Sequence, residues 1–229
     1  MRWRSLLAIG MAVGLAAPLA AQDTRPGIAV LPINNGGSYG QDAENFAALE
    51  IGLQQMLTTE FAANPALRVV DRSRIRDLMA EQDLGASGRV DSETAARLGK
   101  VVGARYMVKG SFIDFYGDFR LDLEVVNVET TEIVRTQQIR KKRDELFAIV
   151  VESAQGLTRG LNLPPLPRQA ARERETRAVP SDAVQLYARA LLYADRGNNE
   201  RAAELFSQAI ERFPEYTEAK QALQQLRNS

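Results

Sequence analysis

The chain has 229 residues, of which 45% are apolar and 25% are charged, with 29 basic and 29 acidic residues and neither Cys nor His. This composition is typical of a folded protein and lacks the positive charge of a nucleic-acid-binding surface. The absence of Cys and His excludes disulfides, zinc–thiolate and iron–sulfur sites, and Ser-His-Asp or Cys-His catalysis. Carboxylate or lysine chemistry stays open as an alternative, but no motif or cluster of such residues indicates it. We predict a protein that is not an enzyme, with no catalytic, metal-binding or cofactor-binding residues and no small-molecule ligand.

Residues 1–21 have the pattern of a cleaved secretory signal peptide. Arg2 and Arg4 precede an apolar run at 6–17, and a Pro-Leu-Ala-Ala segment ends at Ala21. A membrane anchor is the alternative, but a spanning helix needs about 20 apolar residues, so the pattern favours cleavage after Ala21. We expect a periplasmic mature chain without a lipid anchor, because no Cys follows the leader. Peripheral association with the outer membrane is left open.

Residues 22–161 show strand and helix patterns in alternation. A continuous apolar run predicts a buried strand at 28–33, and apolar residues at helical spacing predict a helix from Asp42 to Phe61. A short strand at 68–71 and a helix around 75–79 follow. Asp91 is placed to cap the next helix.

The loop at 36–40 is rich in glycine and lies between a predicted strand and a predicted helix. Such a loop can hold phosphate at a helix start, which would favour an enzymatic or ligand-binding function. This loop lacks the GxGxxG spacing and the Walker lysine. An ordinary connection is therefore the favoured interpretation.

Residues 105–139 are rich in β-forming residues and contain two turns, at 116–118 and 129–131. In the middle strand apolar and charged residues alternate strictly, which indicates one buried and one solvated face. The apolar positions are Phe119, Leu121, Leu123 and Val125, and the charged ones are Arg120, Asp122 and Glu124. A helix is predicted at 146–161. The order βαβααβββα predicts an α+β domain, a mixed sheet covered by helices.

Residues 162–180 contain four prolines and an Arg-Glu-Arg-Glu run. This composition predicts a solvated linker, extended around 163–167. A basic membrane-binding patch is the alternative, which the interleaved glutamates weaken. We expect few contacts across the linker, so that residues 27–161 fold without the tail.

Residues 181–229 predict an all-α helical hairpin with a capping helix. Within them, residues 183–216 resemble one tetratricopeptide repeat, with a small–large–small register in each helix and a closing proline at Pro214. The register residues are Leu186, Ala190 and Tyr193, then Ala202, Phe206 and Ala209. An unrelated helical hairpin is the alternative.

The first helix of this hairpin is apolar on two sides, and one repeat cannot bury both. The register buries Leu186, Ala190 and Tyr193. We therefore predict that Val184, Tyr187 and Leu191, on the opposite side, bind protein: another subunit, a client segment or the chain's own first domain. A merely solvated surface is the alternative.

Four stretches of the first domain, in this order and spacing, carry a resemblance to the CsgG family, to which the folds of FlgO and of the N-terminal domain of TolB are related. They are residues 28–33, residues 69–82, residues 98–104 and residues 106–111. The resemblance implies a CsgG-like fold over residues 22–161. Physically these motifs look architectural, with Asp71 or Ser73 as a helix cap and no catalytic role for Asp71, Arg72 or Glu81. The tight turns at 115–119 and 128–133 leave no room for the membrane hairpins of channel-forming members.

Together these features predict a non-enzymatic adaptor of the periplasm or cell envelope that serves envelope assembly or secretion. Its partner would be a protein, or a second copy, bound through the tetratricopeptide helices. The alternative is a curli-type outer-membrane secretion component that works with a separate pore.

Overall fold

The computed structural model of the chain describes residues 23–82 and 90–228. The predicted signal peptide at 1–21 lies outside these residues. Among the residues described, no helix is long and apolar enough to cross a membrane.

The first part of the chain forms the predicted order of strands and helices, so the α+β fold class is confirmed. The elements are β1 (Gly27–Asn35), α1 (Ala43–Ala62), β2 (Arg68–Val69), α2 (Arg72–Glu81), α3 (Ser92–Val102), β3 (Tyr106–Phe115), β4 (Asp118–Asn127), β5 (Ile133–Lys142), the 3-10 turn η2 (Arg143–Glu145) and α4 (Leu146–Gly160). Asp71 and Asp91 accept hydrogen bonds from the backbone N–H groups of Ser73 and Thr94, at 2.8 and 2.7 Å, and so cap α2 and α3 as predicted.

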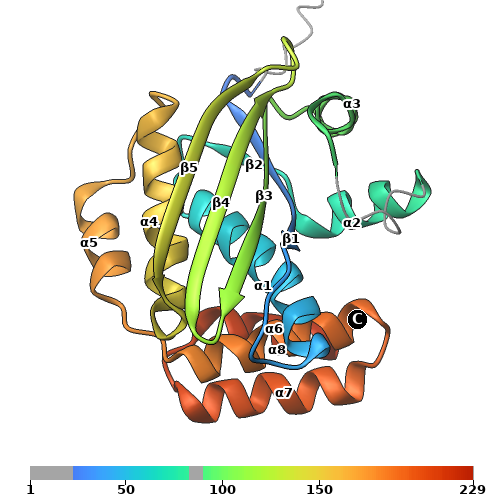
Figure 1. Cartoon of the computed structure of the whole chain (residues 1–229), viewed down its shortest axis with the longest axis vertical. Coiled ribbons are helices and arrows are strands. Elements are labelled where there is room, and N and C mark those ends of the chain that lie inside the picture. Colours follow the sequence, from blue (N-terminus) through green and yellow to red (C-terminus); the bar gives the residue numbers. More distant parts are fainter. Residues whose placement is uncertain (1–22, 83–89, 229) are drawn as a thin grey trace, which may run out of the picture.

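The five strands form one mixed sheet in the order β2-β1-β3-β4-β5. β1 pairs in parallel with β2 and β3, whereas β3, β4 and β5 are antiparallel. Helices α1 and α4 cover one face of the sheet (Figure 1). Helices α2 and α3 pack on the other face, over β1 and the adjoining ends of β3 and β4. The remaining part of that second face, on β3, β4 and β5, is the solvated face that the alternation in β4 predicts.

The segment predicted as a solvated linker contains a short helix, α5 (Arg168–Thr176), after an extended stretch. It makes contacts that the proline and charge content did not indicate. The Arg174 guanidinium lies 2.9 Å from the buried Glu60 carboxylate of α1, and Asn64 donates a hydrogen bond of 2.7 Å to the carbonyl of Pro164. Val179 is buried. The segment is thus held against the rest of the chain.

The C-terminal part forms the predicted helical hairpin and a third helix: α6 (Ser181–Asp195), α7 (Asn199–Arg212) and α8 (Thr217–Asn228). These helices gather at one end of the sheet (Figure 1). Their apolar residues belong to the same core cluster as those of α1, α4 and the sheet. At the α1–α6 contact, a Cβ atom built on Gly52 would lie 2.5 Å from the Cβ atom of Ala188, so only glycine permits this approach.

Candidate interaction surface

The three residues predicted to bind protein are internal. Val184, Tyr187 and Leu191 are 0%, 2% and 6% exposed. The Tyr187 ring packs between Phe206 and Tyr216, at centroid distances of 5.8 and 5.1 Å. Residues so deeply buried offer no surface to another subunit or to a client segment, which corrects these two of the three predicted alternatives and leaves packing within the chain itself.

The assignment of the two faces of α6 also needs correction. Tyr193, which the repeat register places between the hairpin helices, instead donates a hydrogen bond of 3.0 Å from its hydroxyl to Glu44 of α1. Tyr187 takes the place between the helices. Because both faces of α6 are apolar, the pattern alone did not distinguish the face on α1 from the face on α7 and α8. The chain's own first domain covers the helix.

The solvated part of the sheet forms the floor of a groove of about 910 Å³. The floor carries charged residues of β3 and β4 that pair across and along the strands. Lys109 lies 2.9 Å from Glu124, and Arg120 lies 2.8 Å from Asp122. The second carboxylate also accepts a hydrogen bond of 2.7 Å from Gln138 of β5. These pairs neutralise the charged side chains that β3 and β4 contribute to the floor.

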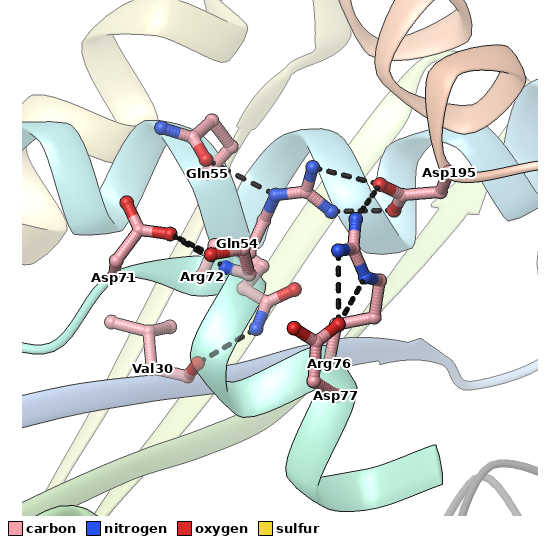
Figure 2. Close-up of polar contacts among 9 residues, drawn as sticks. Val30, Gln54, Gln55, Asp71, Arg72, Arg76, Asp77 and Asp195 are labelled. Carbon is pink, nitrogen blue, oxygen red and sulfur yellow. Dashed lines mark hydrogen bonds and ion pairs between the residues drawn. The ribbon is translucent and has the colours of Figure 1, made fainter. Parts of the chain in front are cut away.

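One wall of the groove is a polar cluster that joins α2 to α6 (Figure 2). The Arg72 guanidinium binds the Asp195 carboxylate with two hydrogen bonds of 2.5 and 3.0 Å, and Arg76 adds a third of 2.9 Å. Arg72 also donates to Gln55 of α1, and Gln54 donates to the carbonyl of Val30. Arg72 thus connects α1 and α2 of the first domain to α6, a contact that the sequence motifs did not indicate.

At the end of the floor lies an exposed group of three aromatic residues, Tyr39, Phe115 and Tyr116, termed the aromatic cluster below. Their exposed fractions are 61%, 57% and 73%. The Phe115 ring meets Tyr39 and Tyr116 edge-on, with centroid distances of 6.1 and 5.1 Å. Phe115 lies on the solvated side of β3, two residues beyond Ile113 of the groove floor.

Backbone hydrogen bonds hold the three aromatic residues in place. The N–H of Tyr39 donates to the carbonyl of Asp114 at 2.7 Å, and the N–H of Tyr116 donates to the carbonyl of Tyr39 at 3.1 Å. Tyr116 and Gly117 both have positive φ, which is typical of a tight two-residue hairpin turn. Gly40 also has positive φ, and a Cβ atom there would lie 2.9 Å from the Tyr116 ring. The loop at 36–40 is therefore an ordered part of this surface.

A fully buried carboxylate, that of Asp114, connects the parts of this end of the sheet. It accepts hydrogen bonds from Gln41 at 2.9 Å, from the N–H of Gly117 at 2.8 Å and from the Arg143 guanidinium at 2.6 Å. The donors come from the loop before α1, from the hairpin turn and from η2. Three segments that are distant in sequence thus meet at one side chain.

The phosphate-binding alternative for the loop is not favoured by its geometry. The start of α1 is capped by Asp42, whose carboxylate accepts a hydrogen bond of 2.7 Å from the N–H of Asn45. A carboxylate at this place repels a second anion. Among the residues described, no group of three or more acidic side chains is arranged to hold a metal ion.

The aromatic cluster was not among the features predicted from the sequence. Two signals were present: the alternation in β4 extends across the turn and places Phe115 on the solvated face, and Tyr116 precedes a turn glycine. What the sequence did not show is that Tyr39, from a loop far away in the chain, completes the cluster.

The fold and this surface define an α+β domain. One face of its sheet is partly uncovered, and the C-terminal helices pack against one end of the domain. Residues 15–120 match the family model of the curli production assembly/transport component CsgG, which is the family that the sequence motifs resemble. No curated protein matches the chain.

Several solved structures align with part of the chain at low similarity. The C-terminal domain of LpoB from Escherichia coli has 21% sequence identity and a TM-score of 0.40, over 52% of this chain and 83% of that one. TolB from Acinetobacter baumannii has 15% identity and a TM-score of 0.42, over 62% of this chain and 30% of that one. The PelC dodecamer from Paraburkholderia phytofirmans has 14% identity and a TM-score of 0.35, over 61% and 90%. At this similarity no binding property passes from these proteins to the chain.

Proposed function

We propose that the chain is a non-enzymatic adaptor of the cell envelope that binds a protein partner through the aromatic cluster. The exposure of Tyr39, Phe115 and Tyr116 on a rigid, hydrogen-bonded end of the sheet is the observation that supports this best. Exposed aromatic side chains held in one place bury a large area at little cost in conformational entropy, and such residues dominate protein interfaces.

The CsgG family model supports the location in the envelope, since its description concerns assembly and transport of curli. In this proposal residues 1–21 export the chain to the periplasm. The tetratricopeptide repeat stays a prediction for α6 and α7. Because the predicted binding face of α6 is internal, the C-terminal helices serve as a brace for the first domain, and the partner contacts the open sheet face instead.

The proposal is tested by affinity capture from an envelope extract with the purified mature chain as bait. The variant replaces Tyr39, Phe115 and Tyr116 by Ser. The matched control is Val101→Ser, which removes a 55% exposed apolar side chain from α3, away from the cluster. We expect a specific partner to be lost with the triple variant and retained with the control, while circular dichroism shows both variants folded.

If the triple variant captures the same proteins as the wild type, the aromatic cluster is not the binding site. Fractionation then addresses the alternative of an outer-membrane secretion component. An adaptor should remain in the soluble periplasmic fraction, whereas a component that works with a separate pore should sediment with the outer membrane.

A further inference from the structure

β5 is the free edge of the sheet. It pairs with β4 on one side, and no other described strand pairs with its second side. Figure 1 shows it as the outermost strand, with α4 packed against one of its faces. An open edge of this length can accept a further strand.

The register shows which backbone groups point outward. The N–H of Arg143 donates to the carbonyl of Gly117 at 2.9 Å, in line with the pairing of Lys142 with Asp118. Hydrogen-bonded and non-hydrogen-bonded pairs alternate along antiparallel strands. The N–H and C=O groups of Thr136, Gln138 and Arg140 therefore point away from β4. All three residues are exposed.

The edge strand carries four basic residues and no acidic one: Arg135, Arg140, Lys141 and Lys142. Two of the four are neutralised by neighbours. Lys141 lies 3.5 Å from Glu145 and 3.2 Å from Glu152 of α4, and Lys142 lies 2.6 Å from Asp118. Over residues 23–82 and 90–228, Arg135 and Arg140 form no ion pair. The edge thus offers unpaired backbone groups beside two exposed arginines that form no direct ion pair.

We propose that β5 binds an extended, acidic segment of a partner protein as an added strand. Backbone hydrogen bonds from the outward groups would hold the segment, and its carboxylates would lie beside Arg135 and Arg140.

A second copy of this chain fits the edge of β5 less well. Antiparallel self-pairing centred on Gln138 would place Arg135 of one copy opposite Lys141 of the other, and like charges directly opposite are destabilising. The proposal does not depend on the aromatic cluster.

The probe for the test is a capped peptide as long as β5 in which pairs of glutamates alternate with pairs of valines, so that carboxylates lie on both faces of the added strand, as Arg135 and Arg140 do on β5. One matched peptide has lysine in place of every glutamate, and the other keeps the acidic sequence but carries an N-methyl group on every residue. We expect the full mature chain to bind the acidic peptide, to bind the basic one at least about tenfold more weakly, and to lose the N-methylated one, because it lacks backbone donors. Bound acidic peptide should slow amide exchange at Thr136, Gln138 and Arg140.

Two substitutions at Gln138 distinguish the contribution of its backbone N–H to peptide binding from that of its side chain. Gln138→Pro removes an outward N–H and leaves the β4–β5 ladder intact, since proline is tolerated on an edge strand. Gln138→Ala keeps the N–H. We expect affinity for the acidic peptide to fall about tenfold or more with Pro and little with Ala. The double variant Arg135→Gln, Arg140→Gln should also weaken binding and reduce its salt dependence.

Several results would overturn the proposal. Equal binding of acidic and basic peptides would do so, as would unchanged amide exchange at β5 in the presence of the acidic peptide. The same holds if analytical ultracentrifugation finds a dimer of the wild type that Gln138→Pro dissociates, since a second copy would then occupy the edge. The exchange measurement uses the wild type, so the test stands even if Gln138→Pro does not fold.

Discussion

The Asp114 carboxylate is the residue on which the aromatic cluster depends. It is fully buried and its Arg143 partner is partly exposed, so the pair is shielded from solvent on one side only. A buried carboxylate of this kind stabilises the fold through the hydrogen bonds that it accepts. Its removal leaves buried donors without an acceptor.

We predict that Asp114→Ala lowers the free energy of unfolding by about 3 kcal/mol, within the usual range for breaking a buried ion pair. Asp114→Asn should lower it less, because the amide oxygen can still accept from the N–H of Gly117. Urea denaturation of the three proteins measures the difference. Equal stability of Asp114→Ala and the wild type would show that the carboxylate does not hold this end of the sheet.

At the scale of single elements, the sequence pattern predicts the structure best where the predicted property depends on one strand or helix alone. The alternation in β4 predicted which side chains are buried, and Phe119, Leu121 and Val125 are 0–1% exposed. The pattern could not predict that the solvated side stays uncovered and becomes a groove. That depends on where α2 and α3 pack, which is a property of several elements together.

The α1–α6 contact gives a second prediction, on Gly52. In an isolated helix Gly→Ala stabilises by about 1 kcal/mol. Here the new Cβ atom would lie 2.5 Å from that of Ala188, and overpacking of this kind costs about 1–3 kcal/mol. We expect Gly52→Ala to be neutral or destabilising in thermal unfolding. Adding Ala188→Gly should restore close packing, so the double variant should show favourable coupling between the two sites.

Glu218 of α8 forms an ion pair with Arg177, which follows α5, and this pair affects the stability of the fold in acid. Burial by itself raises the pKa of Glu218, but hydrogen bonds from Arg177 outweigh it and lower the pKa from 4.5 to about 2. A carboxyl with a depressed pKa in the folded state stabilises the fold above its unfolded value, and this contribution is lost as the pH falls through the folded value. Glu60, whose pKa burial raises despite the nearby Arg174, acts in the opposite sense.

We therefore predict that stability falls as the pH is lowered from 4.5 to about 2, and that Glu218→Gln makes the fall less steep. Urea denaturation across this range measures both proteins. The matched control is Glu204→Gln, since Glu204 pairs with Arg201 on the exposed side of α7. Parallel curves for the wild type and Glu218→Gln would contradict the role of this pair.

At the scale of the whole molecule, the main difference from the sequence prediction is the continuity of the core. Proline and charge content indicated a linker with few contacts, whereas Arg174 and Arg177 bind carboxylates of α1 and α8. Arg177 also lies 5.2 Å from the centre of the Phe147 ring of α4. Composition describes the solvent-exposed part of such a segment well, but it does not show that a few of its side chains reach buried partners.

The last prediction concerns a chain that ends at residue 161. The sequence predicted that residues 27–161 fold alone, but their α1 face packs on α6: Ala48 is 1% exposed in contact with Ala188 and Leu192. Removing α6 exposes this face and leaves Arg72 without Asp195. We expect the truncated chain to unfold at lower temperature than the mature protein, to bind a hydrophobic dye and to self-associate. Asp195→Asn, which removes only the ion pair, is the matched control and should lower the unfolding temperature less. A truncated chain that is monomeric, binds no dye and unfolds as the mature protein does would restore the two-domain interpretation and make the C-terminal helices an independent unit.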